Sequence, residues 1–223
     1  MPPPPDGQLV ALRDGRTVLV RPVYPGDFDR LQRGVQEMSR SSRYMRFFSF
    51  AEGLTDEQAR YFTRIDQVGH VAWCAVEPSE VQRGYGLARF VRVSPDSSIA
   101  NFAVAVIDEM QGCGLGLLLL AAIYLRAGQL GVRTLQGEML PDNPVMPTLM
   151  PKLGGRILFT GDPTCRMIDW PVRRPEFDRD ADVEAGDEEV LPADTNTARQ
   201  FLAYLKVLAP LLESHAVALP RPE

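Results

Sequence analysis

A glycine-rich hexapeptide, Gln-Gly-Cys-Gly-Leu-Gly at residues 111 to 116, has the residue types of a phosphate-binding turn. A β-prone apolar run precedes it, and an Ala/Leu-rich segment of helical length follows it. The first turn of a helix exposes backbone N–H groups without intrahelical partners and carries partial positive charge, so it readily holds a phosphate. Glycines at 112, 114 and 116 remove the side chains that would keep a pyrophosphate away from those amides.

The spacing of this turn separates three phosphate-loop motifs. A P-loop closes with Lys-Ser/Thr, and a dinucleotide fingerprint needs G-x-G-x-x-G; neither fits glycines that alternate strictly before Leu117. The spacing that fits is Gln/Arg-x-x-Gly-x-Gly/Ala, here Gln111, Gly114 and Gly116, five residues past a strand that ends at Val106. This resembles the acetyl-CoA loop of the GNAT N-acetyltransferase superfamily. An ordinary glycine-rich turn between a strand and a helix is the alternative.

The elements that must position this turn follow from hydrophobic spacing along the chain. Apolar periodicity predicts a helix from Phe28 to Met38 with Asp27 as its N-cap, and T-x-x-Q at Thr55 predicts a capping box that begins a second helix. The stretch from Phe102 to the strand at residues 133 to 139 is long enough for a right-handed parallel crossover. Prolines 147 and 151 predict a broken or 3₁₀-like element at residues 145 to 153. The other predicted strands are residues 17 to 21, 71 to 76, 85 to 93, 156 to 160 and 165 to 170.

The whole order of elements resembles the α/β (α+β mixed-sheet) GNAT fold with a C-terminal helical extension. Three segments, RPVYPGD at 21 to 27, SSRYMRFF at 41 to 48 and GEMLPDN at 137 to 143, look like those of bacterial Pat-type protein lysine acetyltransferases. In residues 39 to 50 we expect the arginines on a solvated face and the aromatic side chains as core anchors. The predicted division is a disordered lead at 1 to 11, a GNAT domain at 12 to 172, an acidic linker at 173 to 194 and an amphipathic helical tail at 195 to 223.

The resemblance implies a set of residues that hold acetyl-CoA as co-substrate. Val104, Ala105 and Val106 lie where the family's strand pairs with the pantetheine arm through backbone groups. Asn143 matches an asparagine that contacts cofactor or substrate in many relatives, although Asn before Pro is also a common turn former. The pyrophosphate positions are Gln111, Gly112, Cys113, Gly114, Leu115, Gly116 and Leu117.

The resemblance also implies catalytic positions, and here the sequence departs from the family. Asn101 stands where Pat-type enzymes have a glutamate base, and Asn cannot accept and hold a proton. Met150 stands where many members have a tyrosine general acid. Glu138 is the preferred substitute base, because its strand should adjoin the cofactor strand. Glu109, Asp108 and bound water are alternatives, and a solvent-facing carboxylate with no catalytic role is the other interpretation of Glu138.

Two functions follow. The first is acetyl-CoA-dependent transfer of an acetyl group to a primary amine, of a protein lysine or a small molecule, by an acyltransferase in which proximity supplies much of the rate. The second is a catalytically weak GNAT-fold module that binds acetyl-CoA or CoA as a sensor or regulatory partner.

The composition of the chain indicates which classes of partner the protein has and in which compartment it is located. The 223 residues carry a net charge of −5, which argues against nucleic acid as a partner. The most apolar run is about half of the ~20 residues that cross a bilayer, so no membrane partner is expected. Three separated cysteines and two histidines predict reduced thiols in a cytoplasmic protein and no metal site.

The C-terminal segment carries an apolar stripe that something must cover. Its members, at helical spacing, are Phe201, Leu205, Leu208, Leu211 and Leu212, with an interruption near Pro210. Packing back on the domain, homodimerisation and docking on a protein substrate all satisfy the pattern.

Overall fold

The computed structural model describes residues 7–49, 51–79, 81–173 and 196–216. Within these residues, eight strands form one sheet in the order β1-β2-β3-β4-β5-β6-β8-β7. Only β5 and β6 pair in parallel, as the predicted crossover requires. The strands are β1 Gln8–Ala11, β2 Thr17–Pro22, β3 His70–Val76, β4 Gly84–Arg92, β5 Ile99–Val106, β6 Thr134–Met139, β7 Arg156–Phe159 and β8 Arg166–Pro171.

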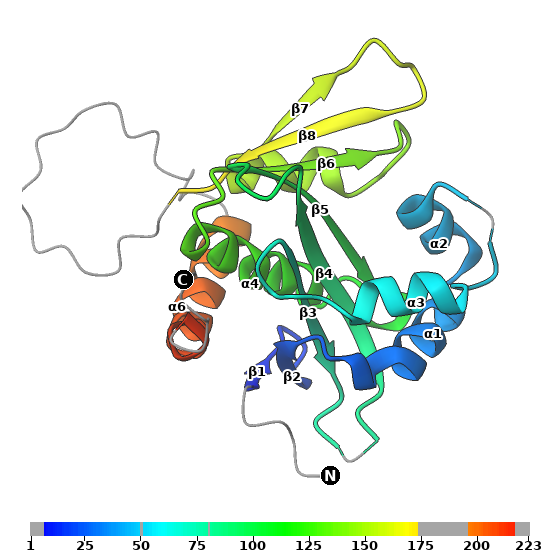
Figure 1. The fold of residues 1–223 in the computed structure, drawn as a ribbon, viewed down its shortest axis with the longest axis vertical. Coiled ribbons are helices and arrows are strands. Elements are labelled where there is room, and N and C mark those ends of the chain that lie inside the picture. The colour runs from blue at the N-terminus through cyan, green and yellow to red at the C-terminus, as the bar shows by residue number, and fades with distance from the viewer. Residues whose placement is uncertain (1–6, 50, 80, 174–195, 217–223) are drawn as a thin grey trace, which may run out of the picture.

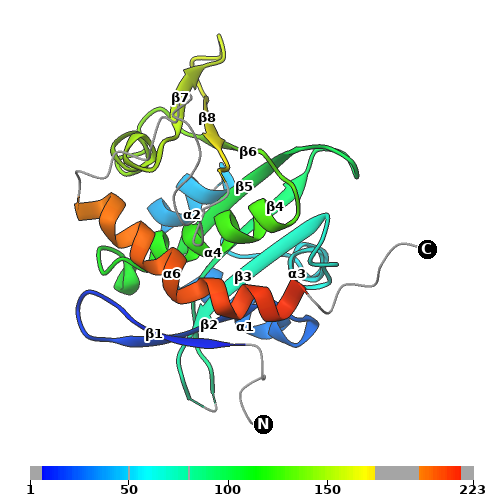
Figure 2. The same ribbon diagram turned by 90° about the vertical axis from the view of Figure 1, so that its left-hand side faces the viewer.

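Helices cover both faces of the sheet. Helices α1, α2 and α3 lie on one face and α4 on the other, with α6 outside α4 (Figures 1 and 2). The predicted broken element is confirmed, since a four-residue α-helix gives way to a 3₁₀ turn at Met150. The helices are α1 Phe28–Glu37, α2 Arg40–Phe47, α3 Asp56–Thr63, α4 Leu115–Gln129, α5 Met146–Leu149 and α6 Asn196–Ala216, and the 3₁₀ turns are η1 Pro25–Asp27, η2 Asp108–Met110 and η3 Met150–Leu153.

Helix α4 is the centre of the core. Every residue from Leu117 to Ala127 is buried, including Arg126, whose guanidinium donates to the backbone oxygen of Gln67 at 3.3 Å. A helix that is apolar all round must be covered on all sides. The sheet covers one side of α4, and α6 covers the other.

The apolar stripe of α6 packs back on the domain. Phe201, Leu205 and Leu208 are buried, and the Phe201 ring lies 5.5 Å from the Tyr124 ring and 5.8 Å from the Trp170 ring. Of the three ways to cover the apolar stripe, packing back on the domain is therefore the one that applies to these three side chains. The helix continues through Pro210. Among the helices of the described residues, none has the length and apolar character needed to span a bilayer.

Two predictions about the N-terminal half are wrong. Residues 8 to 11 do not belong to a disordered lead, because Gln8–Ala11 pair with β2 and place Val10 in the core. The segment at residues 39 to 50 contains a helix, α2, capped by Ser39, whose hydroxyl accepts the Ser42 N–H. None of the residues of α2 is fully buried, so its aromatic side chains do not anchor in the core. Residues 1 to 6, most of the acidic linker (174 to 194) and residues 195 and 217 to 223 of the predicted tail lie outside the described residues.

Of the two predicted helix caps, the one of α3 is confirmed and the one of α1 is not. The capping box of α3 is confirmed, with Thr55 and Gln58 each accepting the backbone N–H of the other. Asp27 precedes α1 but does not cap it with its side chain. Its carboxylate binds Arg21 through two hydrogen bonds of 2.7 Å and also accepts from Arg30 and from the Tyr24 N–H. The sequence predicted a local capping role for Asp27, and packing gave it a buried ion pair.

This ion pair predicts a pH-dependent stability. Burial would raise the pKa of Asp27, but hydrogen bonding and charge from Arg21 outweigh it and hold the pKa below its ordinary value. A carboxylate with a depressed pKa stabilises the fold above its unfolded value of about 3.9, and that contribution is lost as the pH falls toward the folded pKa. Asp27→Asn should cost roughly 2 kcal/mol at pH 7, because it removes the charge that faces a buried guanidinium. The cost should shrink at pH 3. Urea unfolding of the wild type and of Asp27→Asn at pH 7 and pH 3 measures this cost. An equal difference in the free energy of unfolding at the two pH values would contradict this account.

Candidate active site

The glycine turn lies between β5 and α4, and the structure explains its three glycines differently. Gly112 and Gly114 have φ of +76° and +94°, in the left-handed region that favours glycine. A Cβ on Gly114 would also lie 3.0 Å from the Tyr204 hydroxyl of α6. Gly116 lies in the first turn of α4 without a positive φ, and its nearest neighbour to an added Cβ is a Val106 methyl at 3.8 Å. The fold itself therefore requires the first two glycines, whereas it leaves room for a side chain at 116.

A hydrogen-bond network ties the turn to β5 and α2. The Gln111 amide donates to the Val106 carbonyl at 3.2 Å and to the Ser42 hydroxyl at 3.1 Å. Asp108 accepts from the Ser39 N–H at 2.8 Å and from the Ser42 hydroxyl at 2.9 Å. Burial opposes ionisation of Asp108, but these hydrogen bonds outweigh it and hold the pKa below its ordinary value. Asp108 is thus a poor proton acceptor, and its observed contacts are those of a structural anchor.

Strands β5 and β6 part beside this turn. They pair only through residues 99 to 101 of β5, with Asn101 opposite Gln136. The edge of β5 from Phe102 to Val106 therefore lies outside the ladder with β6, while its other edge pairs with β4. A cavity of about 250 Å³ opens at this fork, lined by β5, β6, α2 and the segment around Asn143. Backbone groups on the unpaired edge are available to an amide-rich ligand.

The two candidate catalytic residues both line this cavity. Asn101 lies at the last paired position of β5, and Glu138 lies two residues beyond Gln136 on β6. Because alternate residues of paired strands share a face, Asn101, Gln136 and Glu138 lie on the same side of the sheet. Glu138 is exposed to solvent, and its carboxylate forms no hydrogen bond or ion pair with the described residues. The other acidic alternative, Glu109, is engaged with Arg83 at 3.0 Å.

The remaining predicted residues divide between the cavity and the core. Val104 lines the cavity, whereas Ala105 and Val106, which follow it on β5, line a second cavity on the α1 side of the sheet. Asn143 lines the cavity too, but its side-chain oxygen accepts the N–H groups of Val145 and Met146, so the turn-forming role is realised. The buried residues are Cys113, whose thiol donates to the Met110 carbonyl, Leu115, Leu117 and Met150. Among the described residues, no group of three or more His, Cys, Asp and Glu is placed to hold a metal.

Sequence reasoning missed Arg46 as a residue of this site. Arg46 belongs to α2 and lines the cavity, although the spacing of SSRYMRFF suggested a solvated face for its arginines. The helix was not predicted, so the direction of the side chain was not available. An N-cap serine at 39 was the signal that could have revealed it.

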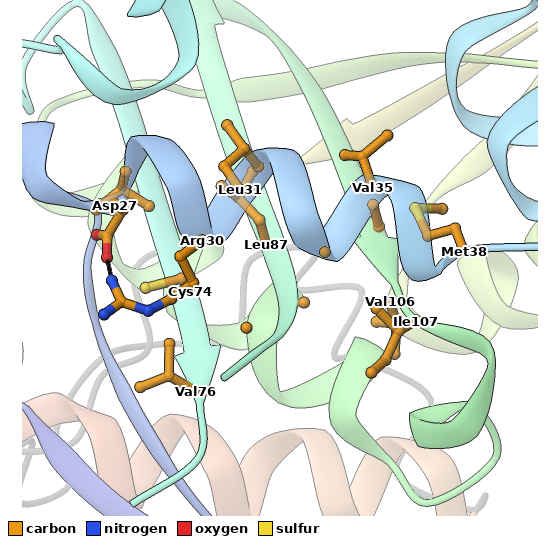
Figure 3. A pocket seen from close by; sticks show the side chains of 15 residues that line it. Asp27, Arg30, Leu31, Val35, Met38, Cys74, Val76, Leu87, Val106 and Ile107 are labelled. Carbon is orange, nitrogen blue, oxygen red and sulfur yellow. Dashed lines mark hydrogen bonds and ion pairs between the residues drawn. The ribbon is translucent and has the colours of Figure 1, made fainter. Parts of the chain in front are cut away.

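A second, smaller cavity of about 60 Å³ lies between α1 and strands β3 to β5 (Figure 3). Its lining is almost wholly aliphatic, with Leu31, Val35 and Met38 on the helix side. The charged residues on its wall, Asp27 and Arg30, are bound to one another. Ala105 and Val106, two of the predicted cofactor-binding residues, line this cavity, whereas the candidate catalytic residues line the fork.

The comparisons with known proteins agree with this geometry. No protein-family model matches the chain. An acetyltransferase Pat of Mycolicibacterium smegmatis is 33% identical over 145 residues, which are 65% of this chain and 43% of the relative. An acetyltransferase of Pseudomonas aeruginosa is 26% identical over 67% of this chain and 80% of the relative. The crystal structure of the GNAT domain of S. lividans PAT has a TM-score of 0.70 and 27% identity over 76% of this chain and 98% of that domain.

The mixed sheet with its forked parallel pair and glycine turn defines a GNAT-fold protein. The chain belongs to the GNAT N-acetyltransferase superfamily, and within it the chain is most like the Pat-type acetyltransferases. It spans less than half the length of the M. smegmatis Pat that it matches.

Proposed function

We propose that this chain is an acetyl-CoA-dependent N-acetyltransferase that acts on a primary amine, with a protein lysine as the acceptor suggested by its Pat-type relatives. The observation that carries the proposal is the separation of β5 from β6 immediately before the glycine turn. That separation leaves an unpaired strand edge and a cavity, and the N-terminus of α4 follows β5 along the chain. In acetyl-CoA, the amide-containing arm matches the strand edge, the thioester matches the cavity and the pyrophosphate matches the helix N-terminus.

The residues present fit such a ligand. The space at Gly116, which the fold does not need, suits the close approach of a pyrophosphate to the amides of residues 111 to 117. The unpaired edge formed by Val104, Ala105 and Val106 suits the amides of the pantetheine arm. Asn143 retains its side-chain NH₂, because only the oxygen is used by the turn. When bound, acetyl-CoA supplies the thioester carbonyl that the amine attacks.

Glu138 is our candidate for the proton acceptor. The attacking nitrogen must lose a proton as its bond to the acyl carbon forms, and the departing sulfur regains one. Glu138 lies on the cavity wall and is open to solvent, so it reaches the amine directly or through a water. Asn101 holds the position next to it without accepting a proton. The site has no tyrosine at position 150 to serve as acid, and solvent takes that role.

The second candidate function is a sensor that binds acetyl-CoA or CoA with little turnover. Asn101 and the buried Met150 favour it, because both stand where the resemblance implies acid–base groups. The two functions share the ligand and differ only in turnover.

Calorimetric titration with acetyl-CoA, followed by measurement of free CoA with and without a lysine-containing peptide, separates the two functions. Binding with peptide-dependent CoA release is expected of the transferase. Binding without release would identify the sensor, and the absence of binding would overturn both.

Glu138→Gln should lower kcat on the order of 10- to 100-fold with little change in acetyl-CoA affinity, because the substitution removes the base and keeps the shape. Steady-state rates and calorimetry measure the two effects. Glu57→Gln, at an exposed position of α3 outside the cavity, is the matched control. If both variants keep wild-type rates, Glu138 is not the base.

We also propose a cytoplasmic location. Cys74, Cys113 and Cys165 are all free thiols in the structure, and two of them are buried. Reduced cysteines of this kind are typical of a cytoplasmic protein.

A further inference from the structure

Among the residues that the structure describes, two arginines on the cavity side of the sheet have no counter-ion. Arg46 lines the cavity from α2, and Arg89 lies on β4 directly opposite Ala103, another residue of the cavity wall. In the described residues, neither guanidinium lies within 4 Å of a carboxylate, whereas Arg21 and Arg83, for example, each have one. An unpaired charge in a partly buried position costs free energy, and a bound anion would offset that cost.

The surroundings of Arg89 are aromatic. Its guanidinium lies 4.5 Å from the centre of the Phe62 ring and 5.6 Å from that of Tyr61, and its Nε is buried without a hydrogen-bond acceptor. His70 Nε2 lies 3.5 Å from its Nη1. Burial, and then the charge of Arg89, lower the pKa of His70 to about 4, so the imidazole is neutral and brings no opposite charge. The carboxylate beside His70, Asp66, is occupied by the N–H groups of Val68 and His70.

Arg46 shares this positive region. It stacks on Phe47 at 4.9 Å and forms no ion pair in the described part of the chain. Burial, and then the charge of Arg89, lower the pKa of Arg46 to about 10. The guanidinium remains protonated at neutral pH, so the cavity has a cationic wall on α2 and an acidic residue, Glu138, on β6.

We propose that the acceptor carries a carboxylate close to the amine that is acetylated, and that Arg46, supported by Arg89, binds this carboxylate while the amine faces Glu138. The inference rests on the proposed transferase function and adds the substrate class to it. An acidic residue next to the target lysine presents this chemistry in a peptide, and a small amino acid presents it with its own carboxylate. A guanidinium suits a carboxylate because its N–H groups can form two parallel charge-assisted hydrogen bonds.

The phosphates of the co-substrate are the competing anions. Their proposed site is the N-terminus of α4, beyond the opposite end of β5 from Asn101, where backbone amides can hold them. Arg46 instead lines the fork cavity, whose wall on β5 is formed by residues 101 to 104 and does not include residues 105 to 117. A ligand in the fork would therefore meet Arg46 on the acceptor side.

The test compares two matched pairs of acceptors at saturating acetyl-CoA. One pair is a lysine peptide with Glu or Gln beside the lysine, and the other is β-alanine and β-alaninamide. The wild type should prefer the acidic member of at least one pair by about 10-fold or more in kcat/KM, mainly through KM. The pair that shows the preference identifies the source of the carboxylate. In Arg46→Gln the ratio of kcat/KM for the acidic acceptor to kcat/KM for the neutral acceptor should fall to about 1. Arg46→Lys should restore part of this preference.

Arg33→Gln is the control, because it removes the same charge from an exposed position on α1, where the side chain donates to the backbone oxygen of Asp29. Equal kcat/KM for both members of both pairs in the wild type would overturn the proposal, as would a loss of acetyl-CoA affinity in Arg46→Gln. If no amine is acetylated, the transferase function fails. Calorimetric binding of the four acceptors to the CoA-saturated protein then decides the carboxylate proposal separately.

Discussion

Gly116→Glu is expected to weaken acetyl-CoA binding by at least about 100-fold while leaving the protein as stable as the wild type or slightly more so. The two effects have opposite signs for a physical reason. A negative side chain in the first turn of α4 interacts favourably with the helix dipole, worth about 0.3–1 kcal/mol. The same charge repels the pyrophosphate, and the side chain fills the space that it needs.

The structure supports this separation of effects. Gly116 has no positive φ, and an added Cβ meets only a Val106 methyl at ordinary contact distance, so the substitution introduces no strain. Calorimetry with acetyl-CoA and thermal unfolding measure the two quantities. Gly116→Ala separates steric from electrostatic blocking and should have the smaller effect on affinity. Unchanged affinity in both variants would mean that this helix end does not hold the pyrophosphate.

Phe201→Ala should lower the free energy of unfolding by about 3–5 kcal/mol, a large part of the stability of a domain of this size. The ring is fully buried between Tyr124 of α4 and Trp170 of β8. Its removal leaves a cavity that the neighbouring rings cannot fill, because Trp170 is held by a 2.8 Å hydrogen bond to the Leu153 carbonyl.

Urea unfolding measures this loss, and Val207→Ala provides the comparison on the same helix. Val207 is 42% exposed, so its truncation should change the stability by about 0.5 kcal/mol or less. Similar values for the two variants would show that α6 is not part of the cooperative fold. The affinity for acetyl-CoA should also fall in Phe201→Ala, since Tyr204 of α6 lies against Gly114.

Local signals in the sequence predicted the elements that form the site. The alternation of glycines after an apolar run predicted the turn, and the distance to residue 133 predicted a parallel neighbour for β5. Prolines 147 and 151 predicted the broken element, because proline removes a backbone donor wherever it stands. These features depend on covalent geometry and short-range hydrogen bonding, which the residues themselves carry.

The sequence by itself determined most of the elements and their order, the glycine turn and the amphipathic tail, but it indicated neither β1 nor α2. Only the tertiary structure decided which charges meet. Asp27 is next to a helix start, yet it binds Arg21 from β2. Asp108 and Glu109 were candidate bases, yet Ser39, Ser42 and Arg83 engage them. Arg46 belongs to a segment with no predicted element, yet it lines the cavity at the fork, as Glu138 does. The partner of a polar side chain depends on segments that packing brings together from distant parts of the chain, and the spacing of residues along one segment does not contain that information.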